Sequence, residues 1–316
     1  MTAKSEVETL RTMRDRGIAV PSAWWPVGNN ADDGHDGELV YFFEEFVEGI
    51  AGVIRKESLP TPTDPSDLIM IRSLARWFVS LESLSFPNFG SLHRCKDLKT
   101  TVVGPHVRYH PSYHSWPYFA GPFPSAKTMY LSLLDLMLQQ TLEGNRYPAG
   151  REIEGYLALL EARALVNGCE GMESGRRYLK HGNDKGDHYM LDGSGVLTGI
   201  IDWEWSFVTC RADAFTAPYA LTDRVFSQEG SNRLTPREQA LADVYEFDLH
   251  RPDLARYVRG GKKFQRTYEF LRFERVRPRC MNAMRRAFLG LGDEALEGEA
   301  ETKKRILEER IRRGEK

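Results

Sequence analysis

The stretch Lys-His-Gly-Asn-Asp-Lys-Gly-Asp-His-Tyr-Met-Leu-Asp-Gly-Ser-Gly-Val-Leu-Thr-Gly-Ile-Ile-Asp-Trp-Glu-Trp, residues 180–205, holds the most informative pattern in the chain. Its first half is polar and contains two glycines, which predicts a loop. Two short apolar runs then flank Gly-Ser-Gly at 193–195, which predicts two strands joined by a tight turn. Asp202 follows the apolar run Gly-Ile-Ile, where an isolated charge is costly. We therefore expect the loop and Asp202 to meet at one cavity.

The overall composition is that of a globular protein. Hydrophobic residues make up 41% and charged residues 28% of the 316 residues, and the formal net charge is -2. This balance suits one large or two modest domains, and it gives no basic surface for nucleic acid. The sequence contains no apolar run near the roughly 20 residues that a membrane span requires. Its four cysteines are far apart, which argues against a disulfide framework and a zinc site. We expect a cytoplasmic protein without a nucleic-acid or membrane partner, and a protein partner stays open.

The loop and hairpin resemble the catalytic segment of the aminoglycoside phosphotransferase and choline kinase-like family. The family's loop begins His-Gly-Asp and ends at an Asn five residues later, and its metal-binding segment reads Ile-Asp-Trp. Here Asn183 stands at the Asp position, His188 at the Asn position and Asp202 at the metal-binding Asp. His188 is shared with a branch associated with fungal members, whose loop resembles His-Gly-Asp-Asp-Lys-Gly-Asp-His.

The resemblance implies an α+β, protein-kinase-like fold with a truncated N-terminal lobe and a mainly helical C-terminal lobe. Residues 1–48 would be the remnant of the N-terminal lobe and hinge. Residues 49–291 would form the helical lobe with the loop and hairpin, and 292–316 a charged helix or tail. The family uses ATP and Mg²⁺ to phosphorylate a small-molecule hydroxyl, and the acceptor cannot be read from this sequence.

The resemblance places Asn183 at the position of the catalytic base. Phosphoryl transfer to a hydroxyl needs a carboxylate that orients the hydroxyl and accepts its proton. An amide can orient the hydroxyl but cannot accept the proton. Asp184 and Asp187 lie close by in the sequence and are candidates to replace the missing carboxylate.

Other residues of the segment receive roles in the same way. Asp202 and His188 stand in for the metal ligands, although imidazole suits magnesium less well than an amide oxygen. Lys185 is a candidate contact to a phosphate group, and solvation is the alternative. His181 is expected to anchor the loop backbone, and Trp-Glu-Trp at 203–205 to form a wall of the site.

Residues 5–16 predict a helix, with Ser5 as N-cap, Glu8 completing a capping box and Gly17 as a stop. In the family this helix carries the Glu that holds a nucleotide-binding Lys, so Glu6 and Glu8 are its candidates here. Four residues precede Ser5. We therefore expect either that a first exon with the Gly-rich loop and the Lys is missing or that the phosphate clamp has been lost.

Residues 38–47 predict a buried strand that runs into a connector. In the family this connector grips adenine through its backbone, which makes Glu44 and Phe46 candidate nucleotide contacts; a plain core strand is the alternative. Residues 104–124 are dense in Pro, His and aromatic residues, and they predict an ordered loop that lines an acceptor-side pocket. His106, His110 and His114 recur at every fourth position, but Pro111 breaks the helix that a metal site would need.

Helices are expected at 64–84, 125–142 and 151–166 and after Thr235, where apolar residues recur every three to four positions. Ser125 and Thr235 are their expected N-caps.

Three functions remain open from the sequence. The favoured one is a degenerate, pseudokinase-like member that binds a ligand in the old cleft. The second is an active ATP-dependent phosphotransferase. The third is a nucleotide-independent enzyme that uses Asp184, Asp187, His188 and Asp202.

Overall fold

The computed structural model describes residues 2–26, 40–52, 65–95, 100–108, 120–147, 150–172, 175–222, 231–272 and 278–291. The α-helices in these ranges are α1 (Thr2–Arg14), α2 (Pro65–Leu81), α3 (Ala126–Leu142), α4 (Glu152–Asn167), α5 (Arg211–Ala214), α7 (Pro236–Asp243), α8 (Pro252–Arg259), α9 (Lys262–Arg272) and α10 (Pro278–Leu289). Single turns of other helix types occur at η2 (Glu170–Met172), η3 (Tyr219–Leu221) and η4 (Val244–Asp248). The predicted tail at 292–316 lies outside the described residues. Within the described ranges, no helix is both long enough and apolar enough to cross a membrane.

The described strands are short and pair antiparallel. They form the pairs β1 (Ala23–Trp24) with β2 (Phe43–Glu44), β4 (Ser91–Cys95) with β5 (Thr100–Gly104), and β6 (Arg177–Lys180) with β9 (Phe207–Cys210). A three-stranded sheet has the order β3 (Ile50–Ala51), β7 (Tyr189–Leu191) and β8 (Leu197–Ile200). Helices with small antiparallel sheets confirm the predicted α+β class and the mainly helical C-terminal part.

The predicted hairpin is present as β7 and β8. Its turn closes through Asp192, whose carboxylate accepts hydrogen bonds from the backbone N–H groups of Ser194 and Val196 at 2.8 and 3.0 Å. Gly195 adopts a φ of +84°, which a side chain would oppose. Asp202 follows the second strand, as the sequence indicated.

Two predicted helix starts are confirmed by their capping bonds. Ser125 accepts a hydrogen bond from the N–H of Thr128 at 3.0 Å and begins α3. Thr235 and Glu238 form a reciprocal capping box at the start of α7. Each side chain satisfies an N–H group that lacks a partner within the helix.

The predicted N-cap at Ser5 is wrong. Helix α1 begins at Thr2, and Ser5 lies inside it with a fully buried side chain. Glu8 does not close a capping box; its carboxylate accepts a hydrogen bond from the Thr101 hydroxyl of β5 at 3.0 Å. Ala and Lys at positions 3 and 4 are good helix formers, so the helix extends beyond the local capping signal. The predicted stop at Gly17 agrees with its φ of +72°.

The predicted buried strand at 38–47 is also wrong within its described part. Only Phe43 and Glu44 form a strand, and Val40, Tyr41 and Phe43 are each about half exposed, at 45–47%. The strand pair β1–β2 has only two residues in each strand, which is too short to bury both of its faces. Its apolar side chains therefore stay partly exposed.

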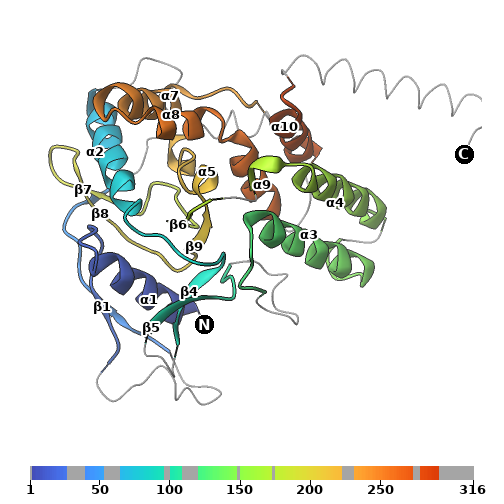
Figure 1. The fold of residues 1–316 in the computed structure, drawn as a ribbon, viewed down its shortest axis with the longest axis horizontal. Helices are drawn as coiled ribbons and strands as arrows, with labels where there is room; N and C mark the ends of the chain where they lie inside the picture. Colours follow the sequence, from blue (N-terminus) through green and yellow to red (C-terminus); the bar gives the residue numbers. More distant parts are fainter. Residues whose placement is uncertain are drawn as a thin grey trace, which may run out of the picture.

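The described apolar side chains gather in two clusters, and the helices that carry them lie on the left and on the right of Figure 1. The first core lies among α1, α2, α7, α8 and the hairpin, and the second among α3, α4, α9 and α10. Strand β9 contributes to both, because Val208 belongs to the first core and Phe207 and Cys210 to the second. The pair β6–β9 therefore joins the two cores, and the loop at 181–188 begins where β6 ends.

A buried ion pair fixes this junction. Asp213 of α5 is fully buried and accepts hydrogen bonds from the Lys180 ammonium at 2.6 Å, from the Thr209 hydroxyl at 2.7 Å and from the Tyr130 hydroxyl. Lys180 also donates to the Asp213 carbonyl at 2.9 Å. The carboxylate thus connects β6, β9, α3 and α5 at one point.

Replacing Asp213 with Asn should lower the free energy of unfolding by roughly 3–5 kcal/mol, because it leaves the Lys180 charge buried without a counterion. Urea unfolding followed by circular dichroism measures the loss. The matched control is Asp135→Asn, which removes an exposed partner of Arg163 and should cost at most about 1 kcal/mol. Equal losses in the two variants would contradict this role.

Candidate functional site

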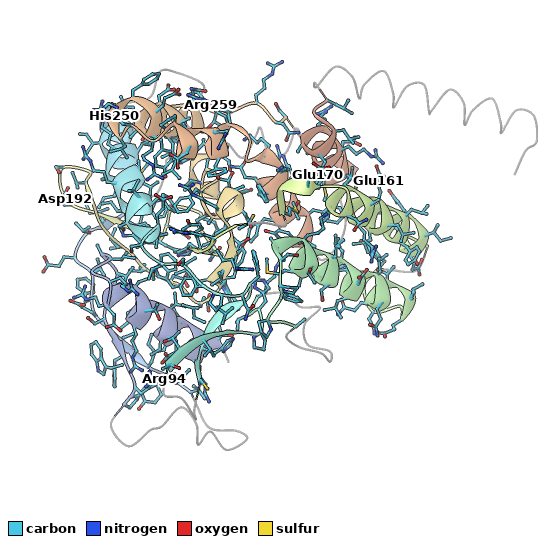
Figure 2. All side chains as sticks on the ribbon, in the orientation of Figure 1. Arg94, Glu161, Glu170, Asp192, His250 and Arg259 are labelled. Atoms are coloured by element: carbon cyan, nitrogen blue, oxygen red, sulfur yellow. The ribbon has the colours of Figure 1, made fainter. Side chains whose placement is uncertain are left out.

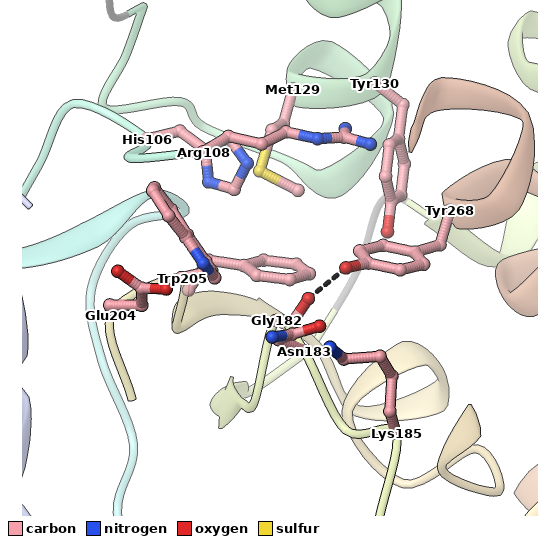
Figure 3. Close-up of a pocket in the computed structure, with 11 residues that line it drawn as sticks. His106, Arg108, Met129, Tyr130, Gly182, Asn183, Lys185, Glu204, Trp205 and Tyr268 are labelled. Atoms are coloured by element: carbon pink, nitrogen blue, oxygen red, sulfur yellow. Dashed lines mark hydrogen bonds between the residues drawn. The ribbon is translucent and has the colours of Figure 1, made fainter. Parts of the chain in front are cut away.

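The loop at 181–188 forms one wall of a cavity of about 310 Å³ (Figure 3). The other walls come from α3, from α9, from the segment after Asp202 and from the segment after β5. The lining residues are His106, Arg108, Met129, Tyr130, Gly182, Asn183, Lys185, Glu204, Trp205, Phe207 and Tyr268. Segments far apart in the sequence thus meet at the predicted loop.

His181 anchors the loop, as predicted. Its Nδ1 accepts a hydrogen bond from the backbone N–H of Asn183 at 3.0 Å, so its Nε2 donates to the carbonyl of Ile201, also at 3.0 Å. Burial lowers the pKa of His181 to about 4, which keeps the ring neutral near pH 7. The ring therefore ties the start of the loop to the residue before Asp202.

Asn183 lines the cavity, and the two neighbouring carboxylates do not lie with it among the lining residues. Asp184 accepts a hydrogen bond from the backbone N–H of Tyr219 at 3.1 Å, and burial raises its pKa. Asp187 is exposed, 3.6 Å from the Lys185 ammonium and 3.4 Å from His188 Nε2. Of the three predicted catalytic residues, the structure brings only Asn183 to the cavity wall.

The two predicted metal ligands contact each other. Asp202 Oδ2 lies 2.8 Å from His188 Nε2. This hydrogen bond lowers the pKa of Asp202; burial alone would lower the pKa of His188, but the carboxylate outweighs it and the pKa is raised. Asp202 also has a φ of +63°, which costs a non-glycine residue about 1–2 kcal/mol. Such strain is concentrated at functional sites.

The residues present do not fit a magnesium site. Magnesium prefers oxygen ligands in near-octahedral geometry, whereas the candidate pair here offers one carboxylate and one imidazole that bond to each other. Across the described ranges, no group of three or more His, Cys, Asp or Glu side chains is arranged to hold a metal ion.

Carboxylates cluster beside Asp202 on the side of α1. Glu6 is 8% exposed, and burial, followed by the charges of Glu44, Asp202 and Glu204, raises its pKa to about 8. Desolvation and the charge of Asp202 likewise raise the pKa of Glu44 and of Glu204. Each carboxylate thus opposes the ionisation of its neighbours, and the cluster offers acidic groups where a phosphate needs cations.

The predicted nucleotide contacts are spread out. Glu44 belongs to this carboxylate cluster, Phe46 is 85% exposed, and Lys185 lies on the cavity wall. The structure does not gather the three around one cavity.

Several cavity residues were not predicted from the sequence. Tyr130 and Tyr268 lie in helices, where their spacing indicates only packing. His106 and Arg108 belong to the segment 104–124, which was expected to line a pocket, and the described start of that segment does so. His110 and His114 lie outside the described residues.

No family model matches the sequence, and no curated protein matches it either. Three solved structures are similar in shape. A thermostable mutant of aminoglycoside phosphotransferase APH(4)-Ia, in a ternary complex with AMP-PNP and hygromycin B, is 14% identical, covers 90% of this chain and 83% of its own, and has a TM-score of 0.48. The streptomycin-ATP complex of APH(2")-IIa is 11% identical, with coverages of 92% and 81% and a TM-score of 0.48. Macrolide 2'-phosphotransferase MphH from Brachybacterium faecium is 13% identical, with coverages of 91% and 79% and a TM-score of 0.41.

All three are phosphotransferases. Two of them are aminoglycoside phosphotransferases, the family that the loop and hairpin resemble. At these identities and TM-scores the likeness concerns shape, and it does not extend to activity or substrate.

Replacing Glu6 with Gln should remove a pH dependence of stability. An unfolded glutamate titrates near 4.5 and folded Glu6 near 8, so between these pH values the folded state holds one proton more. Stability therefore falls as pH rises through this window. The variant imitates the protonated acid, so its gain over wild type should grow from near zero at the lower end to on the order of a few kcal/mol at the upper end.

Urea unfolding at several pH values between these limits measures the gain. Glu48→Gln, which changes an exposed glutamate, is the control and should show no growing difference. A gain for Glu6→Gln that stays constant with pH would contradict the raised pKa.

Proposed function

We propose that this protein is a pseudokinase-like relative of the phosphotransferases, which binds a small molecule in the cavity without transferring phosphate. The observation that carries the proposal is the amide of Asn183 on the cavity wall, while Asp184 is bonded to the N–H of Tyr219 and Asp187 is exposed. An acceptor hydroxyl would be oriented there but would keep its proton. The loss of a positioned base costs roughly 10²- to 10⁴-fold in rate.

The electrostatics beside Asp202 support the same proposal for the nucleotide. A triphosphate needs cations around it, whereas Glu6, Glu44, Asp202 and Glu204 form a cluster in which burial, followed by neighbouring charges, raises the pKa of each glutamate. Lys185 is one nearby cation, and it lies 3.6 Å from the carboxylate of Asp187. ATP and Mg²⁺, which the family resemblance implies, are therefore poorly matched to this cleft.

An active phosphotransferase is the second candidate, and Glu204 favours it. Its carboxylate lines the same cavity as Asn183, and burial together with the charge of Asp202 raises its pKa. A carboxylate with a raised pKa is better suited to accept a proton near neutral pH. In this alternative, Asn183 orients the acceptor hydroxyl and Glu204 takes its proton. A nucleotide-independent reaction by Asp184, Asp187, His188 and Asp202 has less support, because Asp184 is bonded away from the others.

Turnover of ATP tests the proposal. Purified full-length wild type and Asn183→Asp should both form no more ADP than Asp202→Ala, in the presence of magnesium and pooled hydroxylated acceptors, because the amide and the acidic cleft each oppose the reaction. A coupled ADP assay measures the rate.

Two results would overturn the proposal. Turnover by wild type that is lost in Asp202→Ala would establish a phosphotransferase, and a further loss in Glu204→Gln would identify Glu204 as its base. Turnover in Asn183→Asp alone would show that one amide silences an otherwise competent site.

A further inference from the structure

Arg108 is a cation on the cavity wall that lacks a counterion among the described residues. Its Nη2 is buried and has no hydrogen-bond partner there. The guanidinium lies 5.5 Å from the centre of the Tyr268 ring. Such a contact stabilises a cation by roughly 0.5–2 kcal/mol but leaves the N–H groups of Nη2 unsatisfied. Buried donors of a charged group without a partner are costly, so a ligand that accepts from them would be bound favourably.

The neighbouring hydroxyl groups are already in use. The Tyr130 hydroxyl donates to Asp213, and the Tyr268 hydroxyl donates to the carbonyl of Gly182. Asp213 itself accepts from three donors, so it does not neutralise Arg108. The positive charge of Arg108 is thus available to the cavity.

His106 adds a second unsatisfied group to the same wall. It is 6% exposed, and its Nδ1 has no hydrogen-bond partner among the described residues. Burial, followed by the charge of Arg108, lowers the pKa of His106 to about 3, so the ring is neutral. It therefore contributes hydrogen bonding and no additional charge.

The rest of the cavity limits the shape of a ligand. Figure 3 shows Arg108 on one side, Asn183 and Lys185 across the cavity from it, and Glu204 farther away. Trp205 and Phe207 add aromatic side chains to the cavity lining. The space suits a flat apolar body with a polar group at each end, and its volume is near the lower limit for drug-sized ligands.

We propose that the cavity binds a small organic acid, with its carboxylate on Arg108, a flat apolar body against the aromatic walls and a hydroxyl group at Asn183. This assignment rests on the proposed ligand-binding function and names its ligand class. A carboxylate matches the planar fork of the guanidinium. Lys185 is near Asp187, and Glu204 adds a carboxylate to the lining, so Arg108 is the cation left for a ligand, which suits a monoanion better than a dianionic phosphate ester. Cationic aminoglycosides would place amines against Arg108.

Calorimetry with three matched probes tests the assignment. The first is 6-hydroxy-2-naphthoate, the second is its neutral primary amide, and the third is the polycation kanamycin. The wild type should bind the carboxylate at least about tenfold more tightly than the amide, because hydrogen bonds to charged groups contribute more than neutral ones. Kanamycin should neither bind in the cavity nor displace the carboxylate.

Variants of Arg108 test whether the carboxylate of the probe binds to this residue. Arg108→Gln should weaken the carboxylate about tenfold or more, to the level of the amide. Arg177→Gln is the matched control, because Arg177 also lies over an aromatic ring, Phe89, but outside the cavity, and it should change nothing. Arg108→Lys keeps the charge without the fork and should be intermediate. Thermal unfolding of each variant verifies that it is folded, and Arg108→Lys replaces Arg108→Gln if the latter is not.

Four results would each overturn the assignment. The carboxylate probe does not bind, it binds no more tightly than the amide, its affinity is unchanged in both Arg108 variants, or kanamycin binds more tightly than the carboxylate. Phosphorus NMR of the same mixtures with magnesium and ATP separates failure of the carboxylate assignment from failure of the proposed function. Phosphorylation of the probe's hydroxyl would refute the absence of phosphotransfer and leave carboxylate recognition intact. Absence of both binding and transfer would overturn only the carboxylate assignment.

Discussion

The buried contact between Lys180 and Asp213 is the constraint on which the rest of this structure depends. Two opposite charges away from water must be paired and fully hydrogen-bonded, and here the Thr209 and Tyr130 hydroxyls complete the set. The contact holds β6 against β9, α5 and α3, between the two apolar cores. The loop therefore begins at a fixed point, and the same carboxylate orients Tyr130 on the cavity wall.

After Lys180, hydrogen bonds from the polar groups of the loop hold the loop in place. His181 bonds to the N–H of Asn183 and to the carbonyl of Ile201, Gly182 accepts from Tyr268, and Asp184 accepts from Tyr219. Figure 2 draws the side chains of the described residues on the ribbon. The Asp184 carboxylate is thus turned toward Tyr219 and does not lie among the residues that line the cavity. Asn183 is the loop side chain that remains at the wall beside Lys185, and it carries an amide.

Carboxylates gather beside Asp202, and the cavity wall adds a cation. Burial and the charges of their neighbours raise the pKa values of Glu6 and Glu204, and Glu204 also lines the cavity together with Arg108 and neutral His106. Transfer from a triphosphate to a cationic acceptor would need the opposite distribution, with cations at the phosphates and carboxylates at the acceptor. The cation on the cavity wall thus agrees with the proposed binding of an anionic small molecule.

Features that depend on short segments could be predicted from the sequence alone. The hairpin, the caps at Ser125 and Thr235 and the amide at position 183 follow from local hydrogen bonds and residue identity. The sequence could not show that Ser5 is buried, that Asp184 bonds to Tyr219, or that Arg108 lies over the ring of Tyr268. Those contacts join residues far apart in the chain, or depend on which face of a helix is covered, so only the packing of the two cores decides them.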